Sequence, residues 1–213
     1  MMAAKGARVA PFACAAAYTG TTISWSAAVR HLSLLFALVV SCGLLAAPAF
    51  SGDAPAARAM PQVGAVAPAF RLQDQNGHWR SPADYRGHWL VLYFYPKDFT
   101  PGCTTEVCTF RDDIAKLRQA GASVVGVSLD DVKSHGDFAV KYHVPFPLLA
   151  DTEHKAATEY GVLHSMVGMH YAKRTTFLID PQGRIAKVYV DVDPKVNSSE
   201  VLADLAVLKK AEH

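Results

Sequence analysis

The stretch Trp89-Leu-Val-Leu-Tyr-Phe-Tyr-Pro-Lys-Asp-Phe-Thr-Pro-Gly-Cys-Thr-Thr-Glu-Val-Cys108 predicts a buried strand that leads through a short loop into a helix with two cysteines. Residues 89–95 form a near-continuous apolar run rich in aromatic side chains, which is typical of a strand buried on both faces. Residues 96–101 are predicted to be a loop, and residues 102–120 a helix that ends at Gly121.

Strands and helices are predicted to alternate on either side of this stretch. Upstream, the turn residues 74–77 indicate an N-terminal β-hairpin between residues 69–73 and 78–81. Alternation of this kind predicts an α/β protein with a mixed central sheet flanked by helices, the thioredoxin-like architecture. The further strands are expected at 123–128, 146–150, 175–179 and 184–192, and the further helices at 132–142, at 153–160 and from a capping box at 197–200.

The chain is predicted to hold one folded domain at residues 62–213, preceded by a small, Pro-rich linker at 50–61. Its 213 residues, 51% hydrophobic and 19% charged, are sufficient for one good-sized globular domain. Residues 1–49 contain three basic residues and no acidic one, so the remainder is nearly neutral. That charge balance gives no reason to expect binding to nucleic acid or to an anionic membrane surface.

Residues 1–49 have the layout of a secretory signal. Arg30 and His31 precede an apolar run at 32–47, which ends in the small-residue series Ala47-Pro48-Ala49. We therefore expect export, to a bacterial periplasm, with a membrane-anchoring helix as the alternative, although the run is slightly shorter than the ~20 residues of a typical span. The chain would then meet the membrane only through this segment.

Two details of the segment suggest other interpretations. The first 28 residues are long and weakly basic for a signal peptide, and we hypothesise a mis-set start site, with translation beginning at Val29. Val39-Val-Ser-Cys42 resembles a lipoprotein cleavage box with Cys42 as the lipidated residue, although the residues after Cys42 are unusually apolar for a lipoprotein. Cys14 and Cys42 lie in this segment, so the mature body is expected to carry two cysteines, Cys103 and Cys108.

Cys103 is predicted to lie in the first turn of the helix that follows the loop. Thr100 suits the N-cap and Pro101 the first helical position, which places Cys103 at the third position. Free backbone N–H groups converge there, and together with the helix dipole they favour a thiolate, which is the nucleophilic form of cysteine. The alternative of a small buried hydrophobic residue fits poorly with the Thr-Pro-Gly approach.

Cys108 is predicted to lie on a different face of the same helix. Cys103 begins an apolar stripe, whereas Cys108 is turned by ~140° and displaced by ~7.5 Å along the axis, among Arg111, Asp112 and Ala115. A disulfide requires Cα atoms within about 7 Å and Cβ vectors that face each other, so an intact helix would keep these cysteines apart. A disulfide between them would require the helix to unwind locally. The stripe consists of Cys103, Val107, Phe110, Ile114 and Leu117.

Residues 93–112 resemble the peroxiredoxins, specifically the bacterioferritin-comigratory or Q-type subgroup. The superfamily pattern Pro-x-x-x-Thr-x-x-Cys is present from Pro96 to Cys103, and a second cysteine five residues later marks the subgroup. Residues 174–184, Arg-Thr-Thr-Phe-Leu-Ile-Asp-Pro-Gln-Gly-Arg, add support. The resemblance runs from about Val63 to the C-terminus.

The resemblance implies a thiol-dependent peroxidase in antioxidant defence, without metal or cofactor. Cys103 would attack the peroxide and become a sulfenic acid, and Cys108 would resolve it as an intramolecular disulfide. Thr100 would hydrogen-bond the peroxide, Arg174 would stabilise the thiolate, and Pro96 would shield the pocket. Arg174 is preferred to Lys173 because it directly precedes the strand at 175–179, and Glu106 is a motif residue whose role stays open.

The implied substrates are hydrogen peroxide and organic hydroperoxides, and the implied partner is thioredoxin or a thioredoxin-like reductant. The subgroup is often monomeric, so we expect a monomer. A thiol–disulfide oxidoreductase on the same fold is less favoured, because such enzymes use Cys-x-x-Cys and here four residues intervene. A copper chaperone is less favoured, because none of the histidines in this chain lies at ligand spacing from another histidine or from the cysteine pair. A holdase or redox-sensor role has no exposed amphipathic helix to support it.

Overall fold

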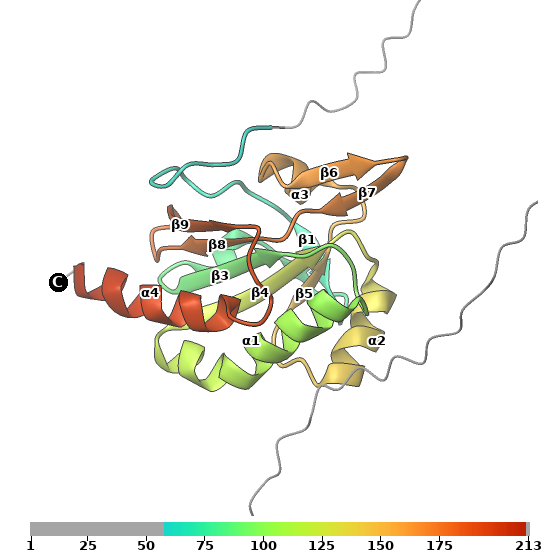
Figure 1. Ribbon diagram of the computed structural model, residues 1–213. Coiled ribbons are helices and arrows are strands. Elements are labelled where there is room, and N and C mark those ends of the chain that lie inside the picture. The colour runs from blue at the N-terminus through green and yellow to red at the C-terminus, as the bar shows by residue number, and fades with distance from the viewer. Residues whose placement is uncertain (1–57, 212–213) are drawn as a thin grey trace, which may run out of the picture. The chain divides into compact units, whose positions relative to one another are not determined.

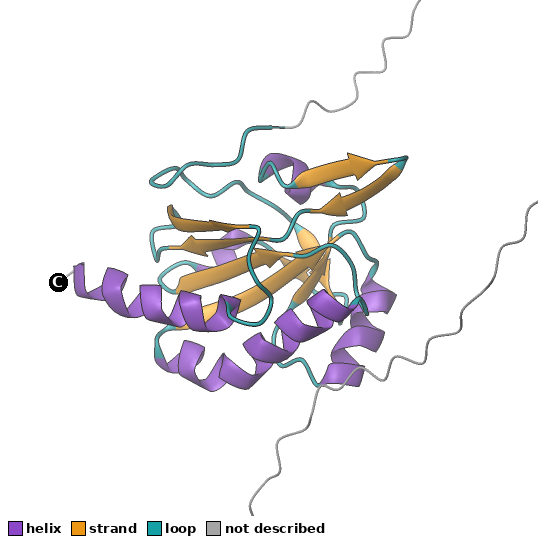
Figure 2. Cartoon of the chain, viewed as in Figure 1, coloured by secondary structure: helices purple, strands orange, loops and turns teal. Residues whose placement is uncertain are grey.

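The computed structural model describes residues 58–211, which form a mixed seven-stranded sheet with helices on both faces (Figures 1 and 2). The strand order is β2-β1-β5-β4-β3-β8-β9, and β6 and β7 form a separate two-stranded sheet. The strands are β1 (Leu72–Asp74), β2 (Trp79–Arg80), β3 (Trp89–Phe94), β4 (Ala122–Ser128), β5 (Leu148–Ala150), β6 (Leu163–Met166), β7 (Met169–Ala172), β8 (Thr175–Ile179) and β9 (Ile185–Val190). The helices are the short 3-10 helix η1 (Pro82–Tyr85), α1 (Pro101–Gln119), α2 (Val132–Tyr142), α3 (Lys155–Glu159) and α4 (Asn197–Ala211).

The N-terminal segment falls outside this description. The predicted signal, the Val29 start, the Cys42 box and the first part of the linker all lie in residues 1–57, beyond the described residues. Within residues 58–211, none of the helices combines the length and apolar character needed to cross a bilayer.

The predicted α/β architecture is confirmed, with small changes in the bounds of its elements. The central strand β3 pairs parallel to β4 and antiparallel to β8, so the sheet is mixed. The N-terminal hairpin is present, but its strands are short, with Leu72 opposite Arg80. The β6–β7 hairpin was not predicted. It lies on the same side of the sheet as α3 (Figure 1).

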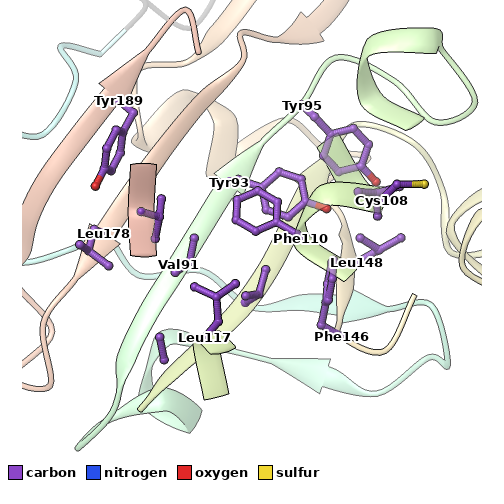
Figure 3. Packing of buried hydrophobic residues seen from close by; sticks show 14 of the residues in the cluster. Val91, Tyr93, Tyr95, Cys108, Phe110, Leu117, Phe146, Leu148, Leu178 and Tyr189 are labelled. Atoms are coloured by element: carbon purple, nitrogen blue, oxygen red, sulfur yellow. The ribbon is translucent and has the colours of Figure 1, made fainter. Parts of the chain in front are cut away.

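The strand β3 is apolar along its whole length because it is covered on both faces. Alternate residues from Trp89 to Tyr95 face α1, α2 and α4 and belong to a larger apolar cluster, part of which is drawn in Figure 3. The residues between them, Leu90, Leu92 and Phe94, pack on the opposite face with α3. Every residue of β3 is buried, as expected for a central strand of such a sheet.

The beginning of α1 follows the sequence prediction closely. Thr100 is the extended N-cap residue and Pro101 is the first helical residue, so Cys103 occupies the third position. The hydroxyl of Thr100 does not cap the helix, however, because it donates to the carbonyl of Lys97 at 2.9 Å. The helix ends before Gly121, whose φ of +76° suits a residue without a side chain.

The predicted capping box at the start of α4 is wrong. Asn197 is already helical, and its side-chain amide nitrogen donates to Glu106 at 3.0 Å and to Thr176 at 2.7 Å. These partners lie on α1 and β8, so the residue joins three elements instead of capping its own helix.

Candidate active site

The buried thiol of Cys103 is in contact with a guanidinium that comes from a distant part of the chain. Arg174 lies in the two-residue connection between β7 and β8, and its Nη2 donates to Cys103 Sγ at 3.2 Å. Gly102 permits this approach, since a Cβ atom there would lie 3.2 Å from the same nitrogen. Lys173, the neighbouring cation, is exposed. The structure therefore brings Cys103 together with the arginine that the sequence favoured.

Glu106 fixes the orientation of this guanidinium. The Nη1 of Arg174 forms an ion pair with Glu106 Oε2, while Nη2 reaches Cys103. Cys103 and Glu106 are three residues apart on α1 and therefore lie on one face of the helix. The other oxygen of Glu106 accepts the hydrogen bond from Asn197. The role that the sequence left open for Glu106 is thus to hold the arginine beside the thiol.

Burial and charge act against each other within this group. Burial raises the pKa of Glu106 to about 7, although Arg174 and Asn197 both favour its ionised form. Burial also lowers the pKa of Arg174, but Glu106 and Cys103 more than offset this, so that pKa lies above its ordinary value. The guanidinium therefore remains a fixed positive charge beside the sulfur.

Thr100 and Pro96 lie in the loop that leads into α1. Pro96 is half-buried, and the hydrogen bond from Thr100 to Lys97 closes the last turn of the loop. This bond uses the hydroxyl hydrogen of Thr100 and leaves its oxygen lone pairs as acceptors. Both residues thus lie in the loop that precedes the first turn of α1.

Cys108 lies on a different helical face from the Arg174 contact, but its surroundings differ from the prediction. It is buried, 4% exposed, and belongs to the same apolar cluster as Phe138. Figure 3 shows it near Tyr95 of this cluster. The reason is that α2 covers this face of α1, as the hydrogen bond from Arg111 to the carbonyl of Tyr142 shows. Cys103 is a free thiol, so no disulfide joins it to Cys108 in this conformation.

A buried polar cluster beneath the same loop was missed in the sequence. Asp98 accepts a hydrogen bond from Tyr95 and contacts Ser134 and His135 at the beginning of α2. We call these four residues the Asp98 cluster. An aspartate in the loop after a strand is an ordinary residue in sequence, and its partners Ser134 and His135 are 36 and 37 residues away.

Comparison with known proteins agrees with this geometry. Residues 63–188 match the AhpC/TSA family. Over 148 residues the chain is 43% identical to peroxiredoxin Bcp of Bacillus subtilis, covering 68% of this chain and 94% of the relative. It is 44% identical over 126 residues to the chloroplastic peroxiredoxin Q of Triticum aestivum, covering 59% of this chain and 58% of the relative.

Solved structures show the same fold. Xylella fastidiosa PrxQ, in the crystal structure of a cysteine-to-serine mutant, superposes with a TM-score of 0.68 at 32% identity, covering 71% of this chain and 99% of that one. Peroxidoxin BcpB of Mycobacterium tuberculosis gives 0.66 at 33% identity, covering 69% and 97%. The expected resemblance is therefore confirmed, and the contact between Cys103 and Arg174 agrees with it. The chain belongs to the AhpC/TSA family and is a thiol-dependent peroxidase of the Bcp and peroxiredoxin Q type.

Proposed function

We propose that this protein reduces hydrogen peroxide and organic hydroperoxides with Cys103 and resolves the product with Cys108. The Cys103 thiolate attacks one peroxide oxygen, the O–O bond breaks, and the leaving oxygen takes up a proton as water or an alcohol. The resulting sulfenic acid condenses with Cys108 in its reduced form to give a disulfide and release water. A dithiol reductant then reduces the disulfide and is itself oxidised.

The observation that carries this proposal is the 3.2 Å contact between Arg174 Nη2 and Cys103 Sγ. Negative charge moves from the sulfur to the departing oxygen during the reaction, and a fixed guanidinium beside both atoms stabilises that charge. Glu106 holds the guanidinium of Arg174 in one orientation, so little reorganisation is needed when the peroxide arrives. Thr100 would hydrogen-bond the peroxide, and Pro96 would shield the thiolate from water.

Resolution by Cys108 requires a change of conformation. The two cysteines are part of one continuous helix, α1, and Cys108 lies five positions after Cys103, which separates them by ~140° around the axis and ~7.5 Å along it. The first turn and a half of α1 must therefore unwind before the sulfurs can meet. We propose that this helix unwinds and reforms in each catalytic cycle.

We propose that the N-terminal segment directs export and so limits which reductant can reach the protein. If residues 1–49 direct export, the reductant must act in the periplasm, and a thioredoxin-like protein with a low-potential dithiol fits this requirement. Mass spectrometry of the mature N-terminus would distinguish cleavage after Ala49 from lipidation at Cys42 and from retention of the whole segment.

A peroxide titration of the wild type and of Cys103→Ser and Cys108→Ser tests the mechanism. Cys103→Ser should not turn over at all. Cys108→Ser should consume one equivalent of peroxide and stop as a sulfenic acid, which dimedone labels, unless an external thiol is added. Continued turnover of Cys108→Ser with thioredoxin alone would show that Cys108 is not needed for resolution.

The titration also separates peroxidase activity from the rival thiol–disulfide oxidoreductase activity. A peroxidase consumes peroxide in the absence of any disulfide substrate, whereas an oxidoreductase would exchange with a model disulfide and leave peroxide unchanged.

A further inference from the structure

The loop between β3 and α1 is held by α2 through Asp98, which is almost completely buried. Asp98 Oδ1 accepts a hydrogen bond from Tyr95 Oη at 2.8 Å, and Oδ2 accepts one from Ser134 Oγ at 2.7 Å. His135 Nδ1 lies 2.9 Å from the same Oδ2. A carboxylate oxygen can only accept, so Nδ1 carries the hydrogen and donates it. One carboxylate thus joins the end of β3 to the first turn of α2.

The backbone of Asp98 is held as well. Its N–H donates to Asp130 Oδ2 at 2.8 Å, and this oxygen also accepts from Ser128 Oγ at 2.7 Å. Asp130 follows the end of β4, so the loop is tied both to the sheet and to α2. Asp98 lies only two residues before Thr100, so the contacts that hold its backbone also restrain the loop next to the first turn of α1.

The next residue, Phe99, is held by α2 through aromatic contacts. Its φ of +61° lies in the left-handed region, which a bulky side chain adopts only when its surroundings hold it there. The ring lies against Phe138 with centroids 5.0 Å apart, and the Nζ of Lys141 lies 5.5 Å from its centroid. Two adjacent residues of the loop therefore depend on α2, one by polar and one by apolar contacts.

The same helix also packs against the part of α1 that must unwind. Phe138 and Ala139 of α2 belong to the apolar cluster that contains both Cys103 and Cys108. Unwinding of the first turn and a half of α1 requires the preceding loop to move, and this movement breaks the contacts of Asp98. The hydrogen bonds of the Asp98 cluster therefore oppose the conformational change and favour the arrangement in which Arg174 reaches Cys103.

We propose that Asp98 and His135 are positioning residues that set the balance between the peroxide-reactive helix and its unwound, disulfide-forming state. The second half of this inference rests on the proposed resolution by Cys108. Neither residue contacts the reacting sulfur. They act through the loop, and their loss should slow the reaction of Cys103 with peroxide and accelerate formation of the disulfide.

Variants of His135 separate the hydrogen bond to Asp98 from simple packing. His135→Asn keeps an amide nitrogen near the position of Nδ1, His135→Gln places one near Nε2, and His135→Leu has neither. His135 Nε2 is buried without a hydrogen-bond partner among the described residues, so a donor at that position gains nothing. We therefore expect His135→Asn to resemble the wild type and the other two to differ from it.

A matched control uses another buried carboxylate. Asp151 is fully buried and accepts hydrogen bonds from the backbone N–H groups of Ala156 and Ala157 at the beginning of α3, on the face of the sheet away from α1 and α2. Asp151→Asn weakens a comparable set of contacts without touching the loop. It reports the effect of lower overall stability alone.

Two rates are measured by rapid quenching and mass spectrometry of the full chain. The rate of sulfenic acid formation is measured in the Cys108→Ser background, where resolution is absent, and the rate of disulfide formation is measured with both cysteines present. For His135→Leu and His135→Gln we expect the first rate to fall at least fivefold and the second to rise at least threefold. His135→Asn should stay within twofold of the wild type, and Asp151→Asn should leave the ratio of the two rates unchanged.

The inference is overturned if His135→Leu and His135→Gln leave both rates within twofold, or if Asp151→Asn changes their ratio to the same extent. Ser134→Ala, which removes one hydrogen bond from Asp98, gives a milder test if a histidine variant does not fold, and it should shift both rates about twofold in the same directions. No shift in Ser134→Ala would also overturn it. If the wild type forms no Cys103–Cys108 disulfide, the proposed resolution fails, while the sulfenic acid rate still tests the positioning role.

Discussion

Replacing Glu106 with glutamine should change how the stability of the protein depends on pH. Glu106 is completely buried, and burial raises its pKa from 4.5 to about 7 even though Arg174 and Asn197 favour the ionised form. Glutamine keeps the shape of the side chain and an oxygen that can accept from Asn197, but it cannot ionise. A shift of about 2.5 pH units at 1.36 kcal/mol per unit corresponds to ~3 kcal/mol of unfolding free energy.

The sign of the effect follows from the raised pKa. The folded state binds the proton of Glu106 more tightly than the unfolded state, so this contribution to stability is complete below pH 4.5. It decreases as the pH rises and is lost above about 7, where both states are ionised. The unfolding free energy of the Glu106 protein, minus that of Glu106→Gln, should therefore fall by ~3 kcal/mol between acid and mildly alkaline pH.

Urea denaturation at intervals from about pH 4 to about pH 8 measures this difference. Both proteins should carry Cys103→Ser, so that the same hydroxyl lies beside Arg174 in each of them. Glu200→Gln, at an exposed position on α4, is the control and should show a nearly constant difference. A difference for Glu106→Gln that is flat, or that rises with pH, would mean that Arg174 outweighs burial and that the reasoning is wrong.

Three further substitutions test other parts of the structure. Arg174→Ala should slow peroxide consumption at least tenfold, because it removes the charge that contacts the sulfur of Cys103. Lys173→Ala is the control and should have little effect. Equal rates for the two variants in a peroxide-consumption assay would contradict the choice of Arg174. Tyr93→Phe removes a buried hydroxyl that has no hydrogen-bond partner among the described residues, so urea denaturation should show unchanged stability or a gain of ~1 kcal/mol. Gly126→Ala would place a Cβ atom 2.7 Å from the ring of Tyr93 and 2.9 Å from Leu148, and it should lower the unfolding free energy by ~1–3 kcal/mol, which a neutral result in the same assay would disprove.

The parts of the fold that the sequence predicts are those determined by neighbouring residues. The continuous apolar run of β3 follows from a strand covered on both faces, and the beginning of α1 follows from Thr100 and Pro101 alone. The β6–β7 hairpin gives no such signal. Its turn places Val167 at a φ of +49°, a conformation that β-branched residues disfavour, so local preference points away from the observed turn.

Within the site, the sequence points to Cys103 and Arg174, which the structure brings into contact, but not to the residues that position them. Cys103 is marked by its place at the beginning of a helix. Asn197 instead resembles a helix-capping residue in sequence. Its true partners, Glu106 and Thr176, are 91 and 21 residues away, so no local pattern reveals them. His135 is similarly ordinary in sequence until α2 packs beside Asp98, 37 residues earlier. Such roles depend on tertiary contacts and have no local pattern.

The positions of Cys103 and Glu106 on one helical turn make the two states of the proposed cycle mutually exclusive. Arg174 reaches the sulfur with one nitrogen and Glu106 with the other, and both contacts require residues 103–106 to be helical. Unwinding this turn to bring Cys103 to Cys108 therefore also separates Glu106 from Arg174. Formation of a neutral sulfenic acid removes the negative charge that attracted the guanidinium, and this weakens the same turn at the step when it must open. In the proposed cycle, the contacts of Arg174 with Cys103 thus lose strength once Cys103 has reacted, while the hydrogen bonds of the Asp98 cluster still hold the loop.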